Sequence, residues 1–480
     1  MNGRLMAAVA LAAMLLLAGC AVGFQPDSAG TEPAESPAND SLGYYDGYWY
    51  NDTFDIDPST GLTDAEMEAV VSRAMARVQL LRGLEFEDRV DVELMTREAF
   101  REQYSGIGER NLSAEARLID NAQYEALFLV GPDDDVADVR QANTGENVLG
   151  FYAPSDERIV IVSDADPATL EDELTLAHEL LHALQDQQFG LASLDGNTSD
   201  AVNARNGLIE GDAVYIERAY ERNCESGAWQ CVAVEGEDRT AGVGDDFHFG
   251  VYFFGFFPYA EGPSFIDHHL VDDDWSAVNA MYDAQPRTAA EIIHPGTYGS
   301  DAYRQVRVTD RNTDAWSRVE PSDGPAYAVV GQSGLASMFA YTIYDEFNAS
   351  QVIEPEEFLN RDASGQLDPD RPFTYDVSYA DGWRGDRLHV YDDGTETASV
   401  WNVVWNDAAN ATEFRDGYEA VLVHWGAERV ETHDSAAVYE IGDAGPFRGA
   451  LWVDLDGDRV TVVKAPSVDD LEDVYAPAGA

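Results

Sequence analysis

Residues 171–191, EDELTLAHELLHALQDQQFGL, contain the motif His-Glu-Leu-Leu-His at positions 178–182. Leucine and alanine recur at helical spacing here, which predicts an amphipathic helix. Residues four apart share a helix face, so His178 and His182 can present two imidazoles to one cation, with Glu179 beside them. The chain has only nine histidines in 480 residues, so two at this spacing are a specific signal. The sequence therefore predicts a metal site, the alternative being a chance HExxH pair with structural hydrogen bonds only.

A third ligand is needed, because a catalytic zinc ion takes three protein ligands and leaves one position open. The metzincin pattern HExxHxxGxxH is excluded, since Gln185 and Gln188 stand at its glycine and last histidine positions. Glu210 follows His182 by 28 positions, on a second helix predicted over residues 199–222. It is flanked by apolar residues, so its carboxylate needs a buried partner. We predict Glu210 as the third ligand; the alternative is an ordinary acidic helix residue.

Other polar residues of the two helices are harder to assign. Asp186 and Asn206 lie one helical turn from predicted ligands, so they could hydrogen-bond to them and orient them, or could equally be surface residues. Asp212, Glu217 and Glu221 fall elsewhere on the second helix and are interpreted as solvated charges.

This ligand set predicts hydrolysis. Zn2+ lowers the pKa of water towards about 7 and polarises a carbonyl, and Glu179 would act as the general base rather than as a ligand. The expected activity is a zinc-dependent peptidase acting on a peptide or protein substrate. The alternative is a catalytically silent surface protein that keeps a zinc-binding scaffold for binding or for envelope architecture. The intact Glu179 favours the enzyme, because a scaffold does not need a base between two ligands.

With these residues in view, the chain resembles the gluzincin branch of the zincin-like metallopeptidases. The phrases HELLHALQDQQFGL and LIEGDAVYIE are similar to those of secreted or surface proteins of bacteria and haloarchaea, and the likeness covers most of residues 145–425. Further similar phrases begin at positions 257, 291, 382 and 405. The resemblance implies a zincin-like catalytic core in a haloarchaeal surface lipoprotein. Val214 departs from the pattern, because many gluzincins carry an acidic residue there that orients the first histidine.

Outside the two helices, His294 is the candidate for stabilising an oxyanion as a second proton donor, with Tyr298 as the alternate. Its place before Pro295 disfavours a helix and would let it project from a loop. A structural turn histidine fits the sequence equally well.

The composition indicates a large folded protein with an acidic surface. Lysine plus arginine number 29 and aspartate plus glutamate 90, a formal net charge of -61, while 45% of the residues are hydrophobic and 11% aromatic. The apolar content supports a large core and excludes ordinary acidic disorder. No basic face could neutralise phosphates, so nucleic-acid binding is not expected. Acidic charge throughout the chain is typical of a protein adapted to high salt, where screening removes self-repulsion.

The N-terminus predicts export and membrane attachment. Residues 1–19 have an early arginine and an apolar stretch, as in a signal peptide, and the segment ending at Cys20 resembles a lipoprotein lipobox. We expect Cys20 to be lipidated and to anchor the chain to the outer face of the cytoplasmic membrane, with residues 20–43 as a flexible tether. A plain secretory signal is the alternative. In an oxidising location, Cys224 and Cys231 are expected to form a disulfide.

The expected fold class is α+β, with a mixed sheet, the HExxH helix and a second ligand-bearing helix in an N-terminal lobe over residues 44–222. An aromatic-rich α+β lobe over residues 223–480 would pack on the same unit. The sequence does not indicate whether the protein is a monomer or an oligomer. The remaining predicted elements are a helix over 64–81 capped by Thr63, a cap at Asp166 or Thr169 for the HExxH helix, strands at 90–95 and 127–130, a hairpin of 148–152 with 159–162, a helix at 330–346, strands at 421–424 and 451–453, and a hairpin turn at 456–457.

Overall fold

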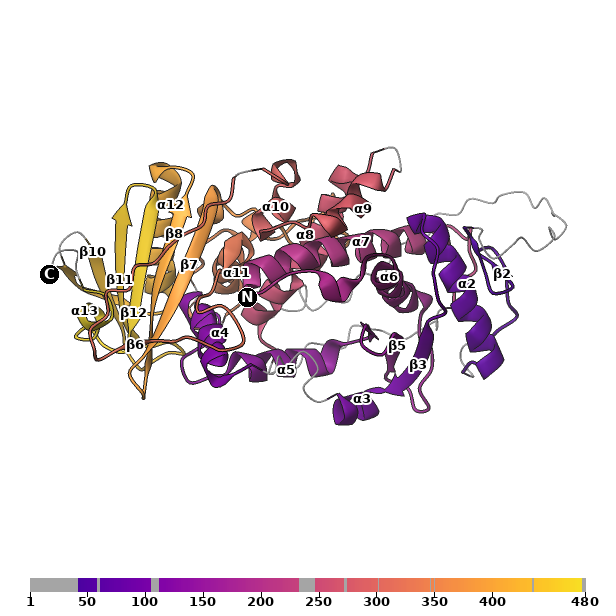
Figure 1. Cartoon of the computed structure of the whole chain (residues 1–480), viewed down its shortest axis with the longest axis horizontal. Helices are drawn as coiled ribbons and strands as arrows, with labels where there is room; N and C mark the ends of the chain where they lie inside the picture. Colours follow the sequence, from indigo (N-terminus) through magenta and orange to yellow (C-terminus); the bar gives the residue numbers. More distant parts are fainter. Residues whose placement is uncertain are drawn as a thin grey trace.

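The computed structural model describes residues 42–57, 61–104, 112–232, 247–271, 274–300, 302–345, 347–348, 350–433 and 436–476. The predicted signal peptide, Cys20 and nearly all of the tether lie outside these residues. The fold class is α+β, as predicted: a helical middle part separates a small mixed sheet from a larger antiparallel sheet (Figure 1). No helix within the described ranges has both the length and the apolar character needed to span a bilayer.

The small sheet contains β3 (Asp91–Thr96), β5 (Arg158–Ser163) and β4 (Gly150–Ala153), in that order. β3 runs parallel to β5 and β4 antiparallel, so the sheet is mixed, and the predicted hairpin is confirmed. Val162 N donates to Leu149 O at 2.8 Å. Hydrogen-bonded pairs alternate along an antiparallel ladder, so Phe151 and Ala153 also direct their backbone groups to β5. The N–H and C=O groups of Gly150 and Tyr152 therefore point to the other, outer edge of β4.

Helix α6 (Glu173–Phe189) carries the HExxH motif and packs against β4. Its N-cap is Asp172, whose carboxylate accepts from Leu174 N at 2.7 Å and Thr175 N at 2.8 Å. The predicted caps Asp166 and Thr169 are wrong, because the helix begins later than expected. The helix ends at Gly190, whose φ of 67° is the left-handed conformation that glycine adopts most readily.

Helix α7 (Ser199–Glu225) contains Glu210 and packs beside α6 and α8 (Phe249–His269). At the α7–α8 crossing, backbone meets backbone: a Cβ atom placed on Gly262 would lie 2.5 Å from Gly207 O and 2.7 Å from Gly211 Cα. Only glycine at these positions allows so close an approach. The crossing sets the distance between the side chains of the two helices.

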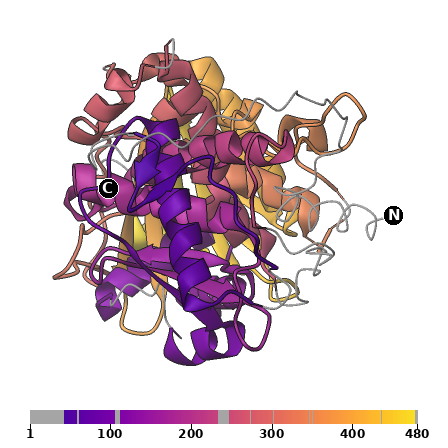
Figure 2. The ribbon, with the colours of Figure 1, turned by 90° about the vertical axis from the view of Figure 1, so that its right-hand side faces the viewer.

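Helix α2 (Asp64–Arg82) begins at the predicted cap Thr63, which forms a capping box with Glu66. The helix lies at the end of the molecule, in front of the other helices in Figure 2. It holds α6 and α7 through buried ion pairs. Arg73 and Arg77 bind Glu173, the first residue of α6, at 2.9 and 2.7 Å. Arg82 Nε binds both carboxylate oxygens of Asp212 on α7, at 2.9 and 3.0 Å.

Because Asp212 and Arg82 have fully buried side chains, the expectation that Asp212 is solvated is wrong. Removing one partner of such a pair leaves an uncompensated buried charge and costs about 3–5 kcal/mol. We refer to these buried ion pairs between α2 and the helices α6 and α7 as the arginine clamp.

The larger sheet has the order β6-β7-β8-β12-β11-β10-β9, and every neighbouring pair is antiparallel. The predicted strand at 451–453 lies in β11, and a turn after Asp456 closes the hairpin with β12, as expected. The predicted strand at 421–424 is wrong, since these residues form the last turn of a helix that packs on the sheet. The bounds are β6 (Ser317–Arg318), β7 (Trp383–Asp392), β8 (Thr397–Trp405), α12 (Ala408–His424), β9 (Glu428–His433), β10 (Ala436–Ile441), β11 (Gly449–Asp456) and β12 (Arg459–Ala465).

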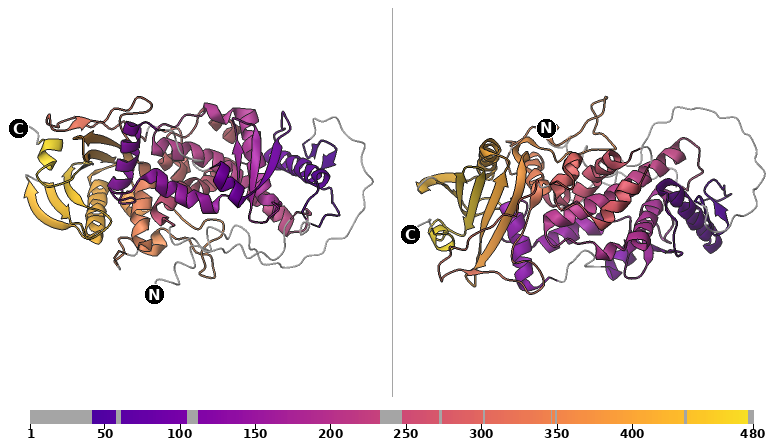
Figure 3. Two further views of the ribbon diagram at one scale, coloured as in Figure 1. Left: turned by 90° about the horizontal axis from the view of Figure 1, so that it is seen from below. Right: turned by 45° about the horizontal axis from the view of Figure 1, so that its top comes forward.

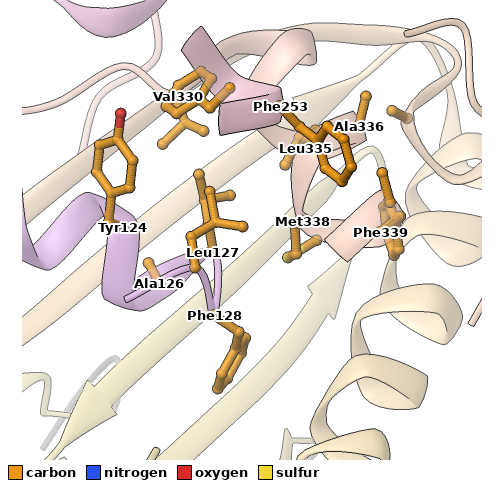
Figure 4. Close-up of a cluster of buried hydrophobic side chains, with 14 of the residues drawn as sticks. Tyr124, Ala126, Leu127, Phe128, Phe253, Val330, Leu335, Ala336, Met338 and Phe339 are labelled. Atoms are coloured by element: carbon orange, nitrogen blue, oxygen red, sulfur yellow. The ribbon is translucent and has the colours of Figure 1, made fainter. Parts of the chain in front are cut away.

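The predicted strand at 127–130 is also wrong. These residues form a buried turn after α4 (Ala114–Ala126), and Phe128 has a φ of 53°, which no strand residue adopts. Leu127 lies in the core close to Met338 of α11 (Gly331–Tyr344), the helix predicted near 330–346 (Figure 4). A short, fully apolar run does not distinguish a buried strand from a buried turn.

Two large hydrophobic clusters cross the predicted lobe boundary at residue 222. One joins α4 to α8, α11, α12 and the larger sheet, and the other joins α2, α6 and the second half of α7. α4 and α5 (Val136–Asn147) therefore lie along the middle part, between the two sheets (Figure 3). The remaining elements are β1 (Tyr44–Tyr45), β2 (Tyr48–Trp49), α3 (Arg97–Gln103), α9 (Ser276–Asp283), α10 (Ala289–Ile293) and α13 (Leu471–Val474).

Candidate metal centre

The two histidines of α6 and Glu210 of α7 point to one another. His178 Nε2 and His182 Nε2 are 3.1 Å apart, and Glu210 Oε2 lies 3.4 Å from the first and 3.3 Å from the second. Each side chain is only 12–15% exposed. The three residues predicted as ligands are thus brought together by the packing of α6 against α7.

This spacing fits a zinc ion. A tetrahedral centre with zinc–nitrogen and zinc–oxygen bonds of about 2.0–2.1 Å separates its ligand atoms by about 3.3–3.4 Å. The observed separations of 3.1 to 3.4 Å match that edge length. Glu210 Oε2 is buried and has no satisfactory hydrogen bond among the described residues, as expected of an oxygen that needs a cation.

The charge state of Glu210 suits a ligand. Burial opposes ionisation of the carboxyl group, but His182 and His178, whose Nε2 atoms lie 3.3 and 3.4 Å from Oε2, outweigh it and hold the pKa of Glu210 well below its usual range. The carboxylate is therefore ionised, as binding to a divalent cation requires.

Both imidazoles are oriented through their other ring nitrogen. His178 Nδ1 lies 2.8 Å from Glu217 Oε2, and His182 Nδ1 lies 2.9 Å from Gln185 Oε1. Gln185 is itself held, because its Nε2 donates to Ile209 O and to the Tyr282 hydroxyl, each at 2.9 Å. These contacts leave Nε2 of each histidine to face Glu210. Metal-ligating histidines commonly have such partners.

The interpretation of Glu217 as a solvated charge is therefore wrong. Glu217 follows Glu210 by seven residues, two helical turns, so both carboxylates lie on the same face of α7. It provides the acidic orienting group that Val214 does not. The spacing of seven was visible in the sequence, but so many acidic residues stand nearby that it carried little weight.

Asp186 and Asn206 have other partners. The Asp186 carboxylate accepts from the Tyr152 hydroxyl at 3.0 Å and from Leu191 N at 2.8 Å. The Asn206 side-chain oxygen accepts from the Arg205 guanidinium at 2.9 and 3.0 Å. The structure does not bring either residue into hydrogen-bonding contact with the histidines.

Glu179 lies next to the three ligands and is 6% exposed. Burial raises its pKa, an effect that the adjacent histidines partly offset. The Tyr152 backbone N–H, at the outer edge of β4, donates to its carboxylate, while Oε2 has no partner among the described residues. A buried carboxylate with a raised pKa and one free oxygen is suited to accepting a proton.

Tyr259 of α8 completes the centre, and the sequence reasoning gave it no role. Its ring stacks on that of His178, with centroids 6.3 Å apart and an interplanar angle of 18°. Its hydroxyl group interacts with the Glu210 carboxylate. Burial, and then the charges of Glu210 and Glu179, raise the pKa of Tyr259 well above its usual range, so the phenol keeps its proton.

His294, the predicted oxyanion donor, lies elsewhere. It follows α10, and its Nε2 is 3.1 Å from Gln332 Nε2 and 3.9 Å from Asp376 Oδ1. Its described contacts do not include the three ligands. The alternate, Tyr298, hydrogen-bonds to Ala284 O. Neither residue is placed next to Glu179.

The predicted disulfide between Cys224 and Cys231 is confirmed, with a Cα–Cα distance of 5.7 Å. It connects the last turn of α7 to the segment that contains Val232. Val232 O accepts from Glu173 N at 3.0 Å, and Val232 N donates to the Glu173 carboxylate at 2.8 Å. The disulfide therefore links the end of α7 to the beginning of α6.

A family model described as a domain of unknown function, DUF8575, matches residues 317–475. The DUF8575 region extends from β6 to the residue after α13 and contains the whole of the larger sheet. His178, His182 and Glu210 precede it in the chain. Comparisons with curated proteins and with solved structures gave no match.

Proposed function

We propose that this chain is a zinc-dependent metallopeptidase. The observation that carries the proposal is the set of three ligand atoms at tetrahedral spacing, with the buried carboxylate of Glu179 directly beside them. Two imidazoles and one carboxylate are a ligand set of catalytic zinc sites. The gluzincin-like zincin fold implied by the sequence is part of the same proposal.

When bound, zinc would polarise the scissile carbonyl and lower the pKa of water. Glu179 would accept the proton of the attacking water and deliver it to the leaving amine as the carbon–nitrogen bond breaks. The protonated phenol of Tyr259 would donate a hydrogen bond to the negative charge that develops on the carbonyl oxygen. Glu217 and Gln185 would hold the two imidazoles in the tautomer and orientation that ligation requires.

The outer edge of β4 supports an extended polypeptide as substrate. Gly150 and Tyr152 direct N–H and C=O groups to this edge, and within the described ranges no strand pairs with it. The Tyr152 N–H already reaches Glu179, so a peptide added along β4 would pass the base. Strand addition gives main-chain hydrogen bonds that are independent of the substrate sequence.

We also propose that the enzyme acts outside the cell, in high salt, anchored through a lipidated Cys20. The apolar leader with its lipobox supports export, and the disulfide supports an oxidising compartment. The net charge of -61 supports adaptation to salt.

The test measures zinc content and peptide cleavage in molar salt for the wild type, Glu179→Gln and Glu210→Ala. We expect Glu179→Gln to keep zinc and lose cleavage, because the amide cannot accept the proton. Glu210→Ala should lose zinc, and circular dichroism should show that both variants fold. Cleavage that survives Glu179→Gln would rule out the mechanism, and unchanged zinc in Glu210→Ala would rule out the ligand. If the zinc-loaded wild type cleaves no peptide of a broad library, the enzyme proposal is rejected in favour of the catalytically silent scaffold.

A further inference from the structure

A cavity of about 550 Å³ lies between α4, the start of α7, α8 and a loop of the DUF8575 region. α4 contributes Ile119 and Tyr124, and the DUF8575 region contributes the loop at residues 323–328. Nothing in the catalytic proposal uses this cavity. We refer to it as the α4–α8 pocket.

The pocket is adjacent to the metal centre. Asn206 lines it one helical turn before Glu210 on α7, and Gly255 lines it one turn before Tyr259 on α8. The two helices run side by side in the same direction. Asn203 Nδ2 of α7 contacts Phe254 O of α8 at 3.4 Å, and eight residues further along each helix Gly211 lies against Gly262. One turn rises about 5.4 Å, so the nearest wall of the pocket lies roughly that far from the ligands and the phenol.

The charged side chains that line the pocket already have polar partners. Asp120 and Arg140 face each other with contacts of 2.6 and 3.1 Å. The Asp323 carboxylate accepts from Ser113 N at 2.8 Å and from Ser113 Oγ at 2.6 Å. A charged side chain entering the pocket would compete with these contacts and would lose part of its hydration. The lining therefore favours a neutral side chain.

Gly255 is an open position of the wall, as is Gly324 on the DUF8575 loop. A Cβ atom at Gly255 would meet nothing within 4 Å, although the residue is within a helix. Glycine in a helix interior costs about 1 kcal/mol relative to alanine, so the local structure does not require it. Because Gly255 has no side chain, the pocket has free space one helical turn from Tyr259.

We propose that the α4–α8 pocket binds a neutral side chain of an extended polypeptide substrate and that Gly255 determines which side chains enter. The inference rests on the proposed peptidase function. An extended chain advances about 3.3 Å per residue, so the pocket would receive a residue about two positions from the scissile bond. The DUF8575 region would then supply one wall of the substrate site.

The experiment separates binding from cleavage. Affinity is measured by fluorescence anisotropy on zinc-loaded Glu179→Gln, with labelled peptides that carry leucine, glutamine, aspartate or lysine two positions from the bond that the wild type cuts. Gly255→Trp, made in the same background, fills the pocket. Gly442→Trp is the matched control, because a Cβ atom at Gly442 also meets nothing within 4 Å and the residue is exposed far from the pocket in sequence.

We expect leucine and glutamine peptides to bind about tenfold or more tightly than aspartate and lysine peptides, and Gly255→Trp to remove most of that difference. Zinc content should not change in either tryptophan variant. Equal affinity of Gly255→Trp and Gly442→Trp for every peptide would overturn the pocket assignment, even with cleavage intact. Absence of cleavage by the zinc-loaded wild type would instead overturn the proposed function, whatever the affinities are.

Discussion

Gly262→Ala tests whether the α7–α8 crossing is as close as the structure shows. The new methyl group would lie 2.5 Å from Gly207 O, whereas ordinary van der Waals contact begins near 3.4 Å, so the helices must separate by about 0.9 Å. Overpacking of this kind typically costs about 1–3 kcal/mol of unfolding free energy. Gly255→Ala is the matched control on the same helix, because its methyl group meets nothing within 4 Å.

The helix-propensity gain of about 1 kcal/mol is common to both substitutions and cancels in their comparison. Urea unfolding followed by circular dichroism should therefore show Gly262→Ala to be about 1–3 kcal/mol less stable than Gly255→Ala. Displacing Tyr259 from Glu210 by about 1 Å should also lower kcat of Gly262→Ala by as much as a hundredfold. Equal unfolding midpoints for the two alanine variants would refute the close crossing.

Three further predictions concern buried charges. Glu217→Gln should weaken zinc affinity about 10–100-fold by equilibrium dialysis, while Glu221→Gln, one turn further along α7, should leave it unchanged. Arg82→Met should lower the unfolding free energy by about 3–5 kcal/mol, and adding Asp212→Leu should restore much of it; a double variant no more stable than the single would contradict the arginine clamp. Burial raises the pKa of Asp200 well above its unfolded value, and the charge of Asp386 raises it further. The protonated Asp200 side chain therefore contributes stability below about pH 4, and this contribution is lost as pH rises through the folded pKa. Asp200→Asn keeps an acceptor for Ala289 N and should therefore be more stable relative to the wild type at pH 8 than at pH 4, measured by urea unfolding.

The parts of the fold that were predictable are those that local sequence determines. α2, α6 and α7 show helical periodicity, and the β4–β5 hairpin has a turn between two apolar runs, so their positions follow from neighbouring residues. The runs at 127–130 and 421–424 were misassigned because short, mainly apolar runs have no periodicity that separates a strand from a turn or a helix end. Their long-range packing determines their conformation.

The candidate site shows the same division. His178, His182 and Glu210 could be found from spacing and known ligand chemistry. Tyr259 could not be found in this way, because its place beside His178 depends on the α7–α8 crossing. The glycines at that crossing do not indicate in the sequence which two helices approach each other. The partners of Asp186 and Asn206 depend on side-chain directions that helical spacing alone does not supply.

The arginine clamp has a consequence for what happens when salt is diluted. Repulsion between exposed acidic side chains grows as ionic screening weakens, and it acts over the whole surface. The ion pairs of Arg73, Arg77 and Arg82 are sealed from solvent, so they are nearly insensitive to the same change. Backbone amides of α2, α6 and α7 should therefore keep their protection from deuterium exchange at salt concentrations where exposed helices have lost it. Loss of structure at low salt would begin at the periphery and reach His178, His182 and Glu210 last.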